Sequence, residues 1–134
     1  MPEKLDWKLI SALSSTGLAM GLLTSVVGLS MRTESFVWVG CYMLWVLFVE
    51  RRGCERPFVH IVMASTLTGL IASAVQLTLL SSYLAHNPDY ADRLEGMSRA
   101  EVAPGFVTQG LLAALVMGVA VGAVAALRRR RRAG

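Results

Sequence analysis

Four long apolar stretches separated by short polar segments dominate the chain. Residues 9–31, 35–49, 57–88 and 102–127 contain no Asp, Glu, Lys or Arg. A transmembrane helix needs about 20 apolar residues to cross a hydrocarbon core of about 30 Å. The pattern predicts an all-α membrane protein, a single domain whose four transmembrane helices form a bundle.

The second stretch is shorter than the others, but helix-end signals lengthen it. Thr33 is placed to cap a helix with Glu34 in its first turn, and Gly53 follows two arginines as a helix-ending glycine does. A helix over residues 33–52 is then about 30 Å long, at about 1.5 Å per residue. The alternative is a buried half-span. We therefore expect spans near residues 9–31, 33–52, 57–85 and 104–127, and a basic tail over 128–134.

The segment between the third and fourth spans has helix signals of its own. Asn87 before Pro88 is typical of a helix start, and Gly96 of a helix end. These signals predict a short helix near residues 88–95, lying at the membrane interface.

A second start signal follows that short helix. The sequence SRAE, Ser98 to Glu101, has the spacing of a capping box. Pro104 is expected to kink any helix that begins there, so we expect a fresh start of the fourth helix near Pro104.

Charge changes the picture by giving the chain an orientation. Hydrophobic residues make up 54% of the 134 residues and charged residues 16%. With four spans, both termini and the loop over residues 50–56 share one side, which holds ten of the thirteen Lys and Arg residues. The positive-inside rule places that side in the cytoplasm. We expect an integral protein of a bacterial inner membrane with cytoplasmic N- and C-termini.

The arginine run at the C-terminus, Arg128 to Arg132, allows two interpretations. Arginine runs bind nucleic-acid phosphates, but they also anchor membrane proteins on anionic lipid. A run that begins where a span ends favours anionic lipid in the bilayer surface over nucleic acid.

Small residues recur at a spacing of four in two of the predicted spans. Such rows let helix backbones approach closely within lipid, where apolar burial alone does not drive association. The third span offers two further rows, one beginning at Ala64 and one at Ser65. The row of the fourth span fits either a helix of the same chain or one of a second copy or partner protein. The predicted packing residues are Gly17, Gly21, Ser25, Gly110, Ala114, Gly118, Gly122 and Ala126.

Polar and aromatic residues within the spans are few, and each has an ordinary structural interpretation. Glu50 and His60 flank the second turn and are placed to pair, as a proton relay or as a local contact. Gln76 and Gln109 are expected near one surface, lining a shallow vestibule or bonding between helices. Three aromatic residues share one face of the second span, suited to a lipophilic cation or to packing: Trp38, Tyr42 and Trp45.

No group of residues indicates catalysis or a cofactor. Cys41 lies within a span and Cys54 in a loop, so we expect no disulfide, and no Cys/His cluster indicates a metal site. A lipid-active enzyme needs a convergent acid–base pair, and only Glu50 with His60 is eligible.

Short motifs resemble those of a group of small, functionally uncharacterised bacterial four-helix inner-membrane proteins. They are GLAMG in the first span, RPFVH at the start of the third and SSYLAHNP at its end. The resemblance implies topology and no activity. Small multidrug transporters of similar size carry a carboxylate in their first span, which this chain lacks; dual-topology fluoride channels lack its charge bias.

Two functions remain in view. The first is a non-enzymatic membrane protein that packs with itself or a partner through its small-residue faces. The alternative is a homo-oligomeric transporter or channel for a small solute or ion, with a wet path between Gln76, Gln109 and the serines of the first span.

Overall fold

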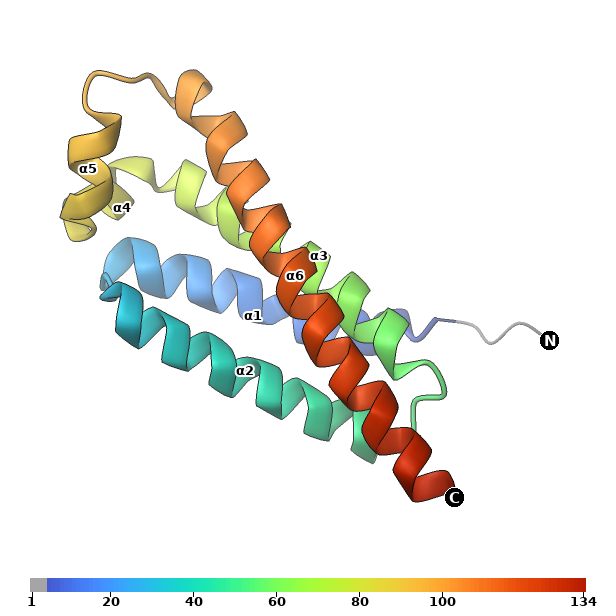
Figure 1. Ribbon diagram of the computed structural model, residues 1–134. Coiled ribbons are helices and arrows are strands. Elements are labelled where there is room, and N and C mark those ends of the chain that lie inside the picture. Colours follow the sequence, from blue (N-terminus) through green and yellow to red (C-terminus); the bar gives the residue numbers. More distant parts are fainter. Residues whose placement is uncertain (1–4) are drawn as a thin grey trace.

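Six helices and no strand make up the part of the chain that the computed structural model describes, residues 5–134 (Figure 1). Four of them, α1, α2, α3 and α6, are long and apolar enough to cross a membrane, as predicted. The six are α1 (Trp7–Val26), α2 (Met31–Arg51), α3 (Pro57–Thr78), α4 (Leu80–His86), α5 (Pro88–Leu94) and α6 (Arg99–Ala133).

The turn between α1 and α2 lies earlier in the chain than predicted. Gly28 has a φ of +73°, a left-handed conformation that ends the first helix well before residue 31. Ser30, rather than Thr33, caps α2: its hydroxyl accepts from the Thr33 N–H at 3.2 Å. The end of α2 is as predicted, with Gly53 at a φ of +65°.

The predicted third span, residues 57–85, is two helices. The backbone leaves helical geometry at Leu79, with φ −100° and ψ 30°, which separates α3 from α4. The short helix α5 begins at Pro88 as predicted, and Gly96 follows it with a φ of +79°.

Asn87 does not cap α5 with its side chain, contrary to the prediction. Its amide donates instead to the carbonyl oxygens of Tyr83 at 2.7 Å and Thr24 at 3.0 Å. Asn87 therefore ties the end of α4 to the end of α1.

The expected fresh start at Pro104 is wrong, because α6 is one helix from Arg99 onward. The capping box forms: Glu101 accepts from the Ser98 N–H at 2.7 Å, and the Ser98 hydroxyl accepts from the Glu101 N–H. Pro104 lies exposed near the helix start, where its missing N–H removes one bond. The predicted basic tail is helical too, and continues α6 to Ala133.

Helix α3 lies between α1 and α6 and contacts both along much of their length (Figure 1). On the α1 side, a Cβ atom on Gly17 would lie 2.5 Å from the Thr68 carbonyl oxygen. A Cβ on Gly21 would lie 2.7 Å from that of Val75, and Ser25 is fully buried. These small residues bring the backbones of α1 and α3 together.

The other face of α3 receives the small-residue row of α6. A Cβ on Gly69 would lie 2.6 Å from the Gly110 carbonyl oxygen, and one on Gly118 would lie 2.8 Å from that of Ser65. Gly122 lies against Phe58 in the same way. The row meets a helix of its own chain, α3.

The last predicted member of the α6 row lies off the contact. Ala126 is half-buried, whereas Ala125 is fully buried. A spacing of four drifts around a helix of 3.6 residues per turn, so the contact moves to the neighbouring residue.

Helix α2 packs through only one half. Tyr42, Trp45 and Val49 are buried at the end shared with Arg128–Arg132, hereafter the arginine end. Towards the opposite end, where α4 and α5 lie and hereafter the α5 end, α2 contacts little: Phe36 is 71% exposed. Gly40 divides the two halves, and a Cβ there would meet nothing within 4 Å.

Gly17 and Gly40 therefore give a matched pair of variants. Gly17→Ala is expected to lower the free energy of unfolding by about 1–3 kcal/mol, because the methyl group overpacks against the Thr68 backbone. Gly40→Ala is expected to be neutral or to stabilise by up to about 1 kcal/mol through helix propensity. Denaturant titration of the purified protein in mixed micelles, followed by circular dichroism, measures both; equal effects would contradict this packing.

Candidate functional site

A cavity of about 370 Å³ lies between α2, α3 and α6, in the half of the molecule towards the α5 end. It forms where α2 stands away from the other helices. Volumes of about 300–1,000 Å³ are typical of small-molecule sites. Its chemically distinctive lining residues are Glu34, Trp38, Tyr42, Thr68, Gln76, Tyr83, Tyr90, Phe106 and Gln109.

The floor of the cavity is a hydrogen-bonded chain across three helices. The Ser65 hydroxyl donates to the Ala114 carbonyl oxygen at 2.6 Å, and the Tyr42 hydroxyl lies 2.6 Å from the Ser65 oxygen. Since the one proton of Ser65 is committed to Ala114, Tyr42 is the donor to Ser65. Trp45 packs edge-on against Tyr42 at 4.9 Å on the arginine side.

Aromatic rings form much of the wall. Trp38 lies 6.2 Å from Tyr42, centroid to centroid, along the face of α2. At the α5 end, Tyr83 lies 5.4 Å from Phe106 and 5.7 Å from Tyr90. These separations are typical of interacting aromatic pairs, so the two groups form ordered parts of the lining.

Short helices α4 and α5 place Tyr83 and Tyr90 over the α5 end of the cavity. The Ser82 hydroxyl donates to the Ser25 carbonyl oxygen at 2.6 Å, which fixes α4 on α1. Burial raises the pKa of the Tyr83 hydroxyl well above its ordinary value, and neighbouring Tyr90 and Glu34 raise it further. Tyr83 therefore stays uncharged at neutral pH.

The mouth of the cavity faces sideways, between α2 and α6. Four lining residues are exposed, and they lie on the facing sides of these helices: Ser35, Val39, Gln109 and Ala113. Tyr83, by contrast, is 6% exposed. The cavity is therefore better covered at the α5 end than along the gap between the two helices.

Three polar side chains of the lining differ in how they are satisfied. Glu34 accepts from the Trp38 indole N–H at 3.3 Å, and the Gln76 amide donates to the Thr24 hydroxyl at 3.1 Å. Thr68 is 1% exposed, and its buried hydroxyl has no protein partner. An unpartnered buried hydroxyl costs about 1–3 kcal/mol, which a bound molecule or water recovers.

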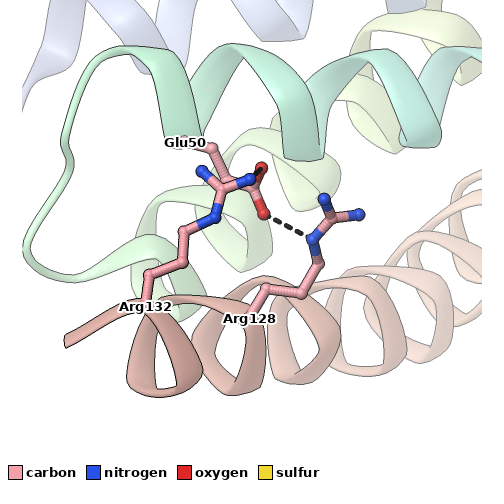
Figure 2. A network of polar contacts seen from close by, with 3 residues as sticks. All are labelled: Glu50, Arg128 and Arg132. Atoms are coloured by element: carbon pink, nitrogen blue, oxygen red, sulfur yellow. Dashed lines mark ion pairs between the residues drawn. The ribbon is translucent and has the colours of Figure 1, made fainter. Parts of the chain in front are cut away.

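The predicted pairing of Glu50 with His60 is wrong. Glu50 binds Arg128 at 2.6 Å and Arg132 at 3.2 Å, with its side chain 8% exposed (Figure 2). The two arginines are one helical turn apart on α6, so both reach the same carboxylate. The sequence pattern did not indicate this pairing, because Arg128 and Arg132 lie far from Glu50 along the chain.

His60 is a buried residue of α3 that lies next to the start of α1. Its Nε2 accepts from the Asp6 N–H and its Nδ1 lies 2.9 Å from the Arg56 carbonyl oxygen. With Nε2 accepting, the proton is on Nδ1 and is donated to Arg56. Glu50 and His60 thus have separate partners.

The sequence found part of the cavity and missed the rest. Gln76, Gln109, Trp38 and Tyr42 all line it, and Gln76 also forms an interhelical hydrogen bond, which was the alternative prediction for it. Trp45 lies below it, and no serine of the first span lines it. The pattern did not predict the aromatic cover formed by Tyr83 and Tyr90. It predicted one continuous span over residues 57–85, whereas the helix breaks at Leu79.

Comparisons with known proteins add no functional assignment. No protein-family model matches the chain, and no curated protein or solved structure is significantly similar to it. Within residues 5–134, no cluster of three His, Cys, Asp or Glu residues is placed to hold a metal ion.

The Glu50 ion pairs predict a selective loss of stability. Replacing Arg128 and Arg132 together by Gln leaves a nearly buried carboxylate unpaired and is expected to cost about 1–3 kcal/mol, less than a fully buried pair because both arginines are half-exposed. The double change Arg130→Gln and Arg131→Gln removes the same charge from the same helix and is expected to cost under about 0.5 kcal/mol. Unfolding in mixed micelles compares them; equal losses would show that net charge, not pairing, matters.

Proposed function

We propose that the chain is a non-enzymatic membrane protein that binds a small amphiphilic molecule in the cavity between α2, α3 and α6, as a transporter or receptor for that molecule. The observation that carries this proposal is the sideways mouth between α2 and α6. In a bilayer this gap faces the lipid, so a molecule that partitions into the membrane reaches the cavity directly.

The cavity also favours binding over the alternative of association through small residues. The small-residue rows of α1 and α6 are covered by α3 of the same chain. A row that is already covered offers little to a second copy or a partner. The cavity, by contrast, has an aromatic lining and a buried hydroxyl without a protein partner.

The orientation of the chain fits this function. Within residues 5–134, nine of the twelve Lys and Arg residues lie at the arginine end, which supports cytoplasmic termini in a bacterial inner membrane. Arg130 and Arg131 are exposed beyond the Glu50 pairs and suit anionic lipid headgroups. The cavity then belongs to the outer half of a four-helix bundle, with α5 lying at the outer interface.

The cavity is deep enough to take an amphiphile with its head at the outer interface. Glu34 and Tyr42 both line it and are eight residues apart on α2. That separation corresponds to about 12 Å along the helix, which is close to half the thickness of a hydrocarbon core. A ligand of this depth has a polar end near Glu34 and an apolar end near Tyr42.

Filling the cavity tests the proposal. Ala113→Phe adds a ring at the mouth, and Ala123→Phe adds the same ring to an exposed position of α6 outside the cavity. The uncharged dye N-phenyl-1-naphthylamine is expected to bind saturably, one per chain, to the wild type and to Ala123→Phe, and roughly tenfold or more weakly to Ala113→Phe.

The measurement is dye fluorescence in dodecyl maltoside, corrected for empty micelles at the same detergent concentration. An equal unfolding midpoint for the two variants controls for misfolding. Identical dye binding by all three proteins, or no saturable binding by any, would refute a binding function for the cavity.

A further inference from the structure

The charge of the cavity wall points to one class of ligand. Among the described residues that line the cavity, Glu34 is the only acidic one, and none is Lys, Arg or His. The remaining polar groups are uncharged amides and hydroxyls. The wall therefore presents one negative charge and no positive one.

Glu34 lacks the partners that the other carboxylate of α2 has. Glu50 binds two arginines, and these are the two ion pairs found in residues 5–134. Glu34 accepts one bond from an indole N–H at 3.3 Å, although it is half-buried at the cavity wall. A half-buried carboxylate that forms no ion pair gains from a ligand that brings a cation.

The aromatic lining favours the same charge. Trp38 and Tyr42 lie on α2, as Glu34 does, and Tyr83, Tyr90 and Phe106 lie across the α5 end. Ring faces carry partial negative charge and attract cations, more strongly where water is excluded. An anion is not attracted by these ring faces, and the carboxylate of Glu34 repels it.

We infer that the ligand is an amphiphilic organic cation, whose charged nitrogen lies between Glu34 and the aromatic rings while its apolar part extends towards Tyr42. This inference rests on the proposed binding function and adds the chemical class. A quaternary ammonium group suits the site best. It has no N–H to satisfy, and it is cheaper to desolvate than a primary amine.

The test uses a cation and its uncharged isostere. Phenyltrimethylammonium and tert-butylbenzene have the same shape and differ in the charged nitrogen. Equilibrium dialysis of the full-length protein in dodecyl maltoside, against empty micelles, measures both. The cation is expected to bind about tenfold or more tightly than the isostere, after correction for partition into micelles.

Matched variants identify the charge responsible. Glu34→Gln is expected to weaken the cation about tenfold or more and to leave the isostere unchanged. Glu95→Gln removes an exposed acid that does not line the cavity, and is expected to change neither affinity.

The possible outcomes distinguish a failure of the cation inference from a failure of the proposed binding function. Equal binding of cation and isostere, insensitive to Glu34→Gln but lost in Ala113→Phe, would overturn the cation class and leave a binding cavity. Binding of neither molecule by the folded wild type would overturn both.

Discussion

The close approach of α3 to α1 on one side and to α6 on the other is the constraint on which the rest of the structure depends. The Thr68 backbone lies where a Cβ atom of Gly17 would have to fit, and the Ser65 Cβ lies 2.8 Å from where one of Gly118 would be. Within lipid, such contacts supply the van der Waals packing that the hydrophobic effect does not. With both small faces of α3 covered, the three helices form a unit, and α2 is left to pack on its edge.

The position of α2 follows from its side chains. Where α2 meets the unit, it presents Tyr42 and Trp45, which are too large for a backbone-to-backbone contact. The Tyr42 hydroxyl and the Glu50 carboxylate hold its arginine half to α3 and α6. Beyond Gly40 comparable contacts are few, so α2 stands away, and the gap is the cavity. The cavity thus exists because only one half of α2 packs against the other helices.

The sequence predicted what depends on local pattern and missed what depends on contacts distant in the chain. Apolar length gave four spans, and Gly53 and Gly96 marked helix ends correctly. The capping box at Ser98 was recognised, but the effect of Pro104 was overestimated, because an exposed proline near a helix start costs little. Gln76 and Tyr42 were singled out, whereas the Arg128 partner of Glu50 and the cover formed by Tyr83 depend on tertiary packing.

Disulfide trapping within a single chain tests the central packing most directly. In a background with Cys41 and Cys54 replaced by Ser, Ser65→Cys with Gly118→Cys places two Cβ atoms 2.8 Å apart, and a shift of about 1 Å reaches disulfide geometry. The control pair is Ser65→Cys with Val116→Cys, because Val116 is 67% exposed on α6. The account predicts a monomeric disulfide for the first pair and none for the control. A disulfide that forms only between differently tagged copies would place the α6 row at an interface between chains and contradict the account.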